Sequence, residues 1–312
     1  MTNAAIDITG TGFAVLDRVY PDEGAPFEAL GGSCGNVLVS LAMLDHSVAP
    51  VLALGWDDVG RRLISEFHQA GANTNYIFRR SDIASPVLAQ QVDTASGQHC
   101  FSFICPETDE HLPRYRAIES AEVEYATEVL NACSVFYTDR LTDAIVSAME
   151  LAHQAGALIY FEPSSIDDWQ LFERAVAMAT ILKCSAERLG SVGPHVAQNS
   201  IAIVTHGAAG LEIVHDGDRV WCDAIPAPQV KDTCGSGDMV SVGVIDWFLR
   251  QKMHAINAIS VGSLREGVVA GQRLAAANCA FVGARGLFSN RSVAYVRALL
   301  DDEPADQFDL FE

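Results

Sequence analysis

Short apolar runs alternate with longer amphipathic segments through most of this 312-residue chain. The apolar runs predict strands at 6–15, 51–54, 134–137, 158–161, 181–183 and 201–205. The amphipathic segments predict helices at 36–44, 61–70, 120–132, 141–155 and 167–179. A chain in which strands and helices take turns folds into an α/β structure. We therefore expect a doubly wound, mostly parallel sheet with helices on both faces.

Two stretches depart from this alternation. Residues 16–30 have the character of an acidic loop, and residues 86–105 resemble two strands around Ser96-Gly97-Gln98. Strands joined by so short a turn predict a hairpin. Such a hairpin serves either as a cover over a site, as a contact between subunits, or as a simple addition to a sheet edge.

The charge balance excludes several classes of partner. The chain has 40 acidic residues against 20 Lys and Arg, a net charge of −20, and only three of the basic residues are Lys. Nucleic acids and anionic membranes both require a basic face, so neither is expected as a partner. No signal-like segment or membrane-spanning apolar stretch is evident, and we expect a cytoplasmic protein.

The cysteines and histidines give no sign of a disulfide framework or a zinc site. The eight Cys include no Cys-x-x-Cys pair, and the nine His include no His-Glu-x-x-His arrangement. We expect free thiols.

The most informative motif is Asp232-Thr233-Cys234-Gly235-Ser236-Gly237-Asp238, which precedes an apolar helix predicted over 239–249. Its glycines leave the backbone exposed, and the amides from Gly235 to Asp238 would be unpaired at a helix N-terminus. Such amides bind a phosphate-sized anion. Asp238, held beside that anion, is well placed to take a proton from a hydroxyl. The motif therefore predicts phosphoryl transfer to an alcohol.

Two other nucleotide-binding classes are disfavoured. The chain has no Gly-Lys pair and hence no P-loop. Gly10 and Gly12 follow strand-like residues within the predicted run 6–15, but Val15 stands where the dinucleotide fingerprint needs glycine or alanine. An NAD-dependent oxidoreductase on a similar sheet is therefore disfavoured.

The same motif resembles the Asp-Thr-x-Gly-x-Gly-Asp signature of the ribokinase-like (PfkB) carbohydrate kinases. Gly31-Gly32 followed by Asn36 resembles that family's second signature, near the N-terminus. Weaker matches, at 55–60 and 205–210, follow in the family's order. The resemblance implies one ribokinase-like catalytic domain over 1–312, with a β lid formed by about 15–30 and 86–105.

The resemblance also implies roles for individual residues. Asp238 would be the catalytic base, and the anion hole would be formed by Gly235, Ser236 and Gly237. The acceptor would be bound by Asp17, Gly31, Gly32 and Asn36. The nucleotide would be bound by Lys183, Ser185, Thr205, Gly207, Gly210, Asn278 and Gly286.

The implied reaction is transfer of the γ-phosphate of ATP, with Mg²⁺, to a primary hydroxyl of a sugar or sugar-like molecule. Some members of the family also use K⁺, and Asp232 stands where that site would be. The lid in many members makes a homodimer. A nucleoside kinase of the same superfamily remains an alternative, because acceptor specificity resides outside the signatures.

Four positions depart from the family pattern. Ser185 and Arg188 replace the Asn and Glu of an Asn-x-x-Glu segment, and Glu162 replaces an Asp that precedes Ser164, itself in place of Asn. These changes bear on the divalent metal, whose protein ligands the sequence does not identify. They keep open a non-catalytic sugar or nucleotide sensor, although Asp238 argues for an enzyme.

Cys234 allows two interpretations. A thiol at a helix N-terminus can have a lowered pKa and be reactive. Alternatively, Cys234 is a small spacer at a position where the family often has Thr.

Overall fold

The computed structural model describes residues 6–189, 200–252 and 259–308. Its main sheet has the order β14-β13-β12-β11-β10-β9-β1-β4. The parallel strands are β4 (Val48–Pro50), β1 (Ile6–Thr11), β9 (Cys133–Thr138), β10 (Leu158–Phe161), β11 (Ile181–Ser185) and β12 (Ile201–Thr205). The antiparallel strands at one edge are β13 (Gly210–His215) and β14 (Asp218–Asp223). The predicted doubly wound, mostly parallel sheet is thus confirmed.

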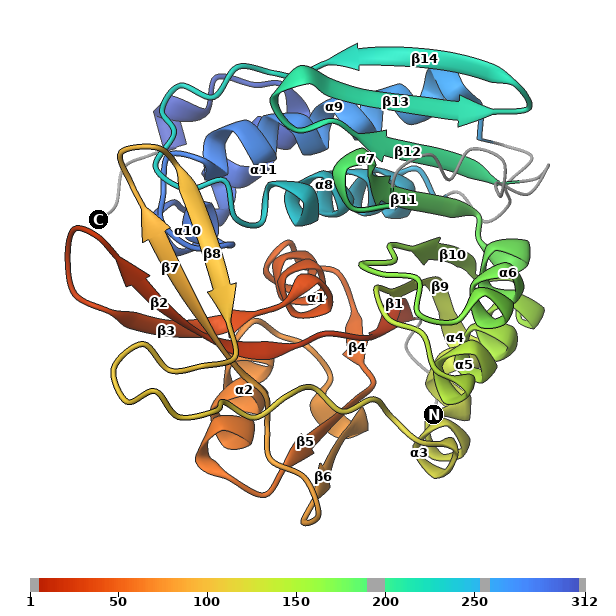
Figure 1. Cartoon of the computed structure of the whole chain (residues 1–312). Coiled ribbons are helices and arrows are strands. Elements are labelled where there is room, and N and C mark those ends of the chain that lie inside the picture. Colours follow the sequence, from red (N-terminus) through yellow and green to blue (C-terminus); the bar gives the residue numbers. More distant parts are fainter. Residues whose placement is uncertain (1–5, 190–199, 253–258, 309–312) are drawn as a thin grey trace.

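Helices cover both faces of this sheet (Figure 1). One face packs against α1 (Ser33–Met43), α8 (Ser236–Arg250), α9 (Val261–Asn278) and α11 (Val293–Asp301). The other packs against α3 (Ser120–Tyr125), α4 (Thr127–Ala132), α5 (Asp143–Gln154) and α6 (Trp169–Met178). Successive residues of a strand point to opposite faces, so Tyr160 enters one core and Phe161 the other. Two short helices lie in connecting segments: α7 (Ala186–Leu189) follows β11, and α10 (Gly286–Asn290) lies between α9 and α11.

A second, four-stranded sheet stands beside the first and is called the small sheet here. Its order is β3 (Phe27–Gly31), β2 (Val15–Pro21), β7 (Val87–Asp93) and β8 (Gln98–Ser102). The hairpin predicted over 86–105 is confirmed as β7 and β8. A further pair, β5 (Leu52–Gly55) and β6 (Ile77–Arg80), adjoins α2 (Asp58–Gln69).

The expected acidic loop over 16–30 is wrong, because this stretch forms the antiparallel strands β2 and β3. Its apolar residues Leu16, Val19 and Leu30 are buried and supply the packing that holds the strands. The predicted helix over 120–132 is also divided in two, at Ala126.

The fold gathers polar residues at one edge of the main sheet. The carboxyl ends of β1, β9, β10, β11 and β12 lie at this edge, because these strands run parallel. Helices α1 and α8 also begin at this edge. A hydrogen bond joins their first turns. Ligands bind at this edge of open α/β sheets. Among the described helices, none has the length and apolarity needed to cross a bilayer.

Candidate active site

The turn before α8 has the geometry expected of an anion hole. Gly235 has φ of 75°, and a Cβ there would lie 2.1 Å from the Ala284 carbonyl oxygen, so only glycine fits. The amides of Gly235, Gly237 and Asp238 have no hydrogen-bond acceptor among the described residues. The Ser236 amide instead contacts the Thr233 carbonyl oxygen at 3.3 Å, and the Ser236 hydroxyl donates to the same oxygen at 2.8 Å. Three amides therefore face outward, while Ser236 shapes the turn.

Asp238 lies in the first turn of α8 and is 8% exposed. Its Oδ2 accepts a hydrogen bond of 2.7 Å from Asn36 Nδ2, in the first turn of α1. Burial raises the pKa of Asp238, and the nearby Glu162 raises it further, while Asn36 and Lys183 oppose the shift. A carboxylate with a raised pKa, oriented by hydrogen bonds from Asn36 and Ser33, is suited to accept a proton from a hydroxyl.

A buried ion pair stands next to the anion hole. Lys183 lies in the middle of β11, and its Nζ pairs with Glu162 Oε1. The other Glu162 oxygen accepts hydrogen bonds from Ser241 Oγ at 2.5 Å and Tyr137 OH at 3.1 Å. A Cβ on Gly237 would lie 3.6 Å from Lys183 Nζ and meet no other atom within contact distance. The ammonium group of Lys183 therefore lies close to Gly237.

Asp17 and the two glycines of the N-terminal motif meet at the edge of the small sheet. Asp17 is 5% exposed, and its Oδ1 has no partner among the described residues. A Cβ on Gly31 would lie 1.8 Å from Asp17 Oδ2, and Gly32 has φ of 78°. Burial raises the pKa of Asp17 to about 8, against the opposing charge of Arg285. Gly31 is thus required because the carboxylate packs directly on it.

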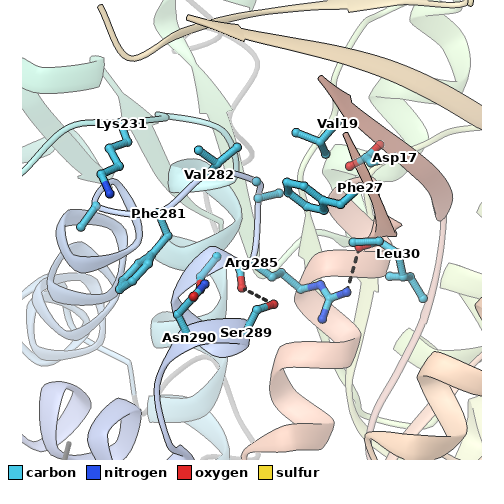
Figure 2. Close-up of a pocket in the computed structure, with 15 residues that line it drawn as sticks. Asp17, Val19, Phe27, Leu30, Lys231, Phe281, Val282, Arg285, Ser289 and Asn290 are labelled. Carbon is cyan, nitrogen blue, oxygen red and sulfur yellow. Dashed lines mark hydrogen bonds between the residues drawn. The ribbon is translucent and has the colours of Figure 1, made fainter. Parts of the chain in front are cut away.

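A cavity of about 300 Å³ opens beside Asp17 (Figure 2). Phe27 of β3 lines one side, and Lys231, Phe281 and Arg285 line the other. Arg285 Nη2 donates to the Leu30 carbonyl oxygen at 2.8 Å, while its buried Nε has no partner among the described residues. One unpaired acceptor on Asp17 and one unpaired donor on Arg285 suit a polar ligand, because a buried polar group left unpaired is costly.

Asp139 and Arg140 are site residues that the sequence analysis missed. Asp139 is 1% exposed, accepts from the Phe13 amide at 2.8 Å and pairs with Arg140 Nη1 at 2.9 Å. Burial raises the pKa of Asp139 to about 6. Arg140 also donates to Ser164 Oγ at 2.6 Å. Asp139 directly follows β9, and a polar residue at the carboxyl end of a parallel strand was the available signal.

Four of the predicted nucleotide-binding residues come together at the ends of β11 and β12. Ser185 and Thr205 are paired in register, and Thr205 Oγ1 donates to the Cys184 carbonyl oxygen at 3.4 Å. Gly207 has φ of 58° with open space around it, and Gly210 has φ of 131°. The positive φ values explain both glycines and leave the backbone after Thr205 open to a ligand.

The remaining two predicted nucleotide-binding residues are the last residue of α9, Asn278, and the first residue of α10, Gly286. Asn278 is fully buried, donates to the carbonyl oxygens of Cys234 and Ala284 at 3.2 Å each, and accepts from the Leu287 amide at 2.9 Å. A Cβ on Gly286 would lie 2.4 Å from Phe281 Cβ. In this structure Asn278 therefore holds the backbone on both sides of the anion hole.

Asp232 is fully buried at the start of the glycine motif. Its Oδ1 accepts from the Cys234 amide at 2.9 Å, and His99 Nδ1 lies 3.1 Å from the same oxygen. Its Oδ2 accepts from Gln90 Nε2 and from the Gly283 amide, each at 2.9 Å. Gln90 and His99 come from the small sheet, and nothing in the sequence motifs pointed to them.

The interpretation of Cys234 as a reactive thiol is wrong. Cys234 is 6% exposed, and burial together with the charges of Asp17 and Asp232 raises its pKa well above the ordinary value. Cys234 is a small buried spacer. The expectation of free thiols is confirmed, since all eight cysteines are unpaired.

Within the described ranges, no group of three or more His, Cys, Asp or Glu side chains could hold a metal ion. Arg188, one of the departures from the family segment, and its neighbour Glu187 are exposed on α7. Glu162 already has partners on both oxygens. A divalent ion here would therefore take most of its ligands from bound phosphates and water, as Mg²⁺ commonly does.

Comparison with known proteins agrees with this geometry. The profile of the pfkB family carbohydrate kinases matches residues 26–289. A fructokinase from Klebsiella pneumoniae is 28% identical over 75% of this chain and 81% of that protein. An aminoimidazole riboside kinase from Salmonella typhimurium is 27% identical over 81% of this chain and 84% of that protein. A solved fructokinase with bound ATP, from Xylella fastidiosa, has the same fold, with a TM-score of 0.75 and 20% identity over 95% of this chain and 98% of its own.

Proposed function

This chain belongs to the PfkB family of carbohydrate kinases, and we propose that it transfers the γ-phosphoryl group of ATP to a primary hydroxyl of a sugar. The observation that carries this proposal is the position of Asp238. Its carboxylate has a raised pKa and is fixed by Asn36, directly beside three unpaired amides. A base next to an anion hole is what transfer of a phosphoryl group to an alcohol requires.

In the proposed reaction, the acceptor oxygen forms a bond to the γ-phosphorus while the bond to the bridging oxygen of ADP breaks. Asp238 Oδ1 or Oδ2 takes the hydroxyl proton, and the leaving electron pair stays on the β-phosphate of ADP. The amides of Gly235, Gly237 and Asp238 donate to the transferred oxygens, and Lys183 adds a positive charge on the same side. Positioning and electrostatic stabilisation then supply most of the rate.

We further propose that ATP carries Mg²⁺ into the site, where the ion neutralises charge on the phosphates. Glu162, the partner of Lys183, is a carboxylate close to this site. Because both Glu162 oxygens are already engaged, Glu162 would hold the ion through its waters. The backbone after Thr205, with Gly207 and Gly210, is proposed to bind the nucleotide.

The acceptor is proposed to lie between Asp238 and Asp17. Asp17 would accept hydrogen bonds from hydroxyls, and Gly31 and Gly32 would let the acceptor approach the backbone. Asn36 orients Asp238. Asp139, buried at the end of β9, adds a second carboxylate at this edge of the sheet. Such a set of acceptors suits a polyol.

One observation favours a nucleoside as a second candidate acceptor. The cavity beside Asp17 has the aromatic side chains Phe27 and Phe281 on its walls (Figure 2). Aromatic walls suit a flat base, whose face they can contact. The riboside kinase relative is named for an acceptor of that shape.

We propose that the whole chain acts as one catalytic unit in the cytoplasm. The small sheet is proposed to be its lid, and the lid is proposed to form the contact of a homodimer. The support for the dimer is the free edge of β8, next to Phe101 and Ile104, which are 43% and 45% exposed. Exposed apolar residues at a free strand edge favour pairing with another chain. Light scattering on the purified protein tests the dimer.

An ATP-consumption screen over pentoses, hexoses, keto-acid sugars and nucleosides tests the proposed function. A thermal-shift measurement with the same compounds, with and without ATP, reports binding separately. We expect turnover with at least one sugar or nucleoside, and a raised melting temperature with the same compound. Binding without turnover for every compound would instead support a non-catalytic sensor.

A further inference from the structure

Arg140 lies at the point where the strand order of the main sheet reverses. Within this sheet, β1 is followed in the chain by β4 on one side and then by β9 on the other. The carboxyl ends of β1 and β9 therefore flank the crevice in which open α/β sheets bind their ligands. Phe13 follows β1 and Arg140 follows β9, and the guanidinium carbon of Arg140 lies 4.7 Å from the centre of the Phe13 ring. Arg140 thus stands at this crevice.

Among the described residues, one nitrogen of the Arg140 guanidinium makes all of its hydrogen bonds to the protein. Nη1 donates to the Asp139 carbonyl oxygen and to Asp139 Oδ2 at 2.9 Å each, and to Ser164 Oγ at 2.6 Å. Nε and Nη2 have no acceptor there, and the side chain is 26% exposed. These two nitrogens donate from one edge of a planar group, and such an edge matches the two oxygens of a carboxylate.

The Arg140 side chain is held in one orientation. Asp139 and Ser164 fix Nη1, and the Phe13 ring supports one face of the guanidinium. Tyr115 packs edge-on against Phe13, with ring centres 5.9 Å apart. Ser164 is one of the departures from the family pattern, and its hydroxyl is an acceptor that Arg140 uses. A side chain that is already ordered loses little entropy when it binds a ligand.

Asp139 uses both of its carboxylate oxygens inside the protein. Oδ1 accepts from the Phe13 amide at 2.8 Å, and Oδ2 accepts from Arg140. A Cβ on Gly12 would lie 1.9 Å from Asp139 Oδ1 and 3.2 Å from Cys34 Cβ, so the carboxylate lies close to the first turn of α1. Asp139 is buried, whereas Arg140 is accessible. The member of this pair that meets a ligand is therefore Arg140.

Arg140 and the proposed base lie near the same turn of α1. Asp238 accepts a hydrogen bond from Asn36 of this turn, and Asp139, the partner of Arg140, lies close to Cys34 of the same turn. Burial raises the pKa of the Cys34 thiol, and the charges of Asp139, Arg140 and Asp238 all act on it. An acceptor lying along this turn would present one end to Asp238 and the other end to Arg140.

We propose that Arg140 is a specificity-determining residue that binds the carboxylate of a sugar acid, and that the acceptor is an aldonic or keto-aldonic acid. Such acids carry a primary hydroxyl and a carboxylate at opposite ends of one chain. A phosphate group would bring a second negative charge beside Asp139. Asp17 does not oppose an anionic acceptor, because burial raises its pKa to about 8 and leaves it largely neutral at pH 7. The proposal rests on the proposed function, since it assigns Arg140 to the same acceptor site.

The first experiment measures the binding of matched pairs of compounds by calorimetry and thermal shift, without ATP. Gluconate and glucitol, galactonate and galactitol, and 2-ketogluconate and fructose differ only in a carboxylate that replaces a terminal hydroxymethyl group. We expect at least one acid to bind about tenfold or more tightly than its neutral partner, because hydrogen bonds to a charged group are stronger. Equal affinity or no binding in every pair would overturn the proposal, as would tighter binding of fructose 6-phosphate than of every acid.

The second experiment uses variants. Arg140→Met should abolish the preference for the acid and leave the affinity for its neutral partner little changed. Because this variant leaves Asp139 buried without its cation, the double variant Asp139→Asn, Arg140→Met is measured beside it. Ser164→Ala releases Nη1 without removing the free edge and should reduce the preference in part. Arg114→Met is the matched control, since Arg114 also lies over a phenylalanine ring, that of Phe103, at 4.7 Å, and the preference should remain in this variant.

These measurements separate the inference from the proposed function. A preference for the acid that disappears in both Arg140 variants supports the carboxylate site, even if no compound is phosphorylated. ATP consumption with a neutral sugar, together with a preference for the acid that survives in Arg140→Met, would contradict the inference and leave the proposed function standing. A merely structural role for Arg140 predicts that acid and neutral partner lose affinity by the same factor, and that result would also overturn the proposal.

Discussion

Asn36 and Asp238, 202 residues apart in the sequence, are joined by a hydrogen bond of 2.7 Å from the Asn36 amide to the Asp238 carboxylate. Each residue lies in the first turn of its helix, and the bond therefore fixes α1 against α8 at the edge of the sheet. Because Asn36 donates to the charged form, it opposes the burial that raises the pKa of Asp238. Asn36 of the N-terminal motif thus helps to set the pKa of Asp238 in the glycine motif.

Replacing Asn36 by Leu should move the pH dependence of the reaction. Loss of this donor raises the pKa of Asp238 further, and the base is active only when deprotonated. The acidic limb of kcat/KM should shift to higher pH by about 1 unit. Asn75→Leu, in an exposed turn, is the control and should leave the limb in place. An unchanged limb in the Asn36 variant would remove Asn36 from this role.

Two alanine substitutions in the anion hole should have opposite effects on folding. Gly237 lies in α8, and an added Cβ meets only Lys183 Nζ, at 3.6 Å. Gly237→Ala should therefore fold, with about 0.5–1 kcal/mol of added stability, because alanine favours the helix. Turnover should still fall about 100-fold or more, because the methyl group occupies the space of the transferred phosphoryl group.

Gly235→Ala, by contrast, places a Cβ 2.1 Å from the Ala284 carbonyl oxygen at a φ of 75°. It should lower the melting temperature as well as the activity. Calorimetry and the ATP-consumption assay on both variants check the pair. Full activity in Gly237→Ala would show that the phosphoryl group binds elsewhere.

Ionisation of Asp17 should lower the free energy of unfolding as the pH rises. Its pKa is raised by burial from 3.8 to about 8, so folding favours the protonated form. The associated stability is complete below the unfolded pKa of 3.8 and is lost as the pH rises to about 8. Asp17→Asn does not titrate, so its melting temperature should increasingly exceed that of the parent across this range while acceptor binding is lost.

The control for Asp17 is Asp218→Asn, at an exposed position of β14. It should show no such pH-dependent gain. If the Asp17 variant kept a constant difference in melting temperature at every pH, the buried carboxylate would not be the source of the effect.

The pair of Lys183 and Glu162 allows catalysis to be separated from stability. Lys183→Met leaves the carboxylate of Glu162 buried without its cation and should cost about 3–5 kcal/mol. The double variant Lys183→Met, Glu162→Gln removes both charges and should recover most of the stability. Turnover should stay low in both variants, because the positive charge beside the transferred phosphoryl group is missing. Recovery of turnover in the double variant would give Lys183 a structural role only.

The sequence predicted the parallel strands β1, β9, β10, β11 and β12 of the main sheet, but not β4 or the antiparallel β13 and β14. Strands such as β10 and β12 are continuous apolar runs because both of their faces are buried, and such runs are visible without a structure. The glycines at 31, 32, 235 and 237 mark places where the backbone must be bare. Such requirements concern residues close together in the chain, so the sequence alone shows them.

Contacts between segments far apart in the sequence cannot be predicted in this way. The hairpin residues Gln90 and His99 meet Asp232 only because the small sheet folds against the glycine motif. The residue pattern at 16–30 indicated a loop, because the acidic turn between β2 and β3 obscures buried residues such as Val19, whereas the family resemblance implied a β lid there. The interpretation of Cys234 as a reactive thiol rested on its helix N-terminus alone, whereas burial raises its pKa and agrees with the alternative of a small spacer.

The most direct test of the account is the rate of phosphoryl transfer in Asp238→Asn, measured in a single turnover together with acceptor and ATP binding. Asn keeps the size of Asp238 and can still contact Asn36, but it cannot take a proton. We predict that both ligands bind with near-unchanged affinity while the rate falls about 100-fold or more. A rate within about threefold of the parent would contradict the account, because Asp238 would then not be the base.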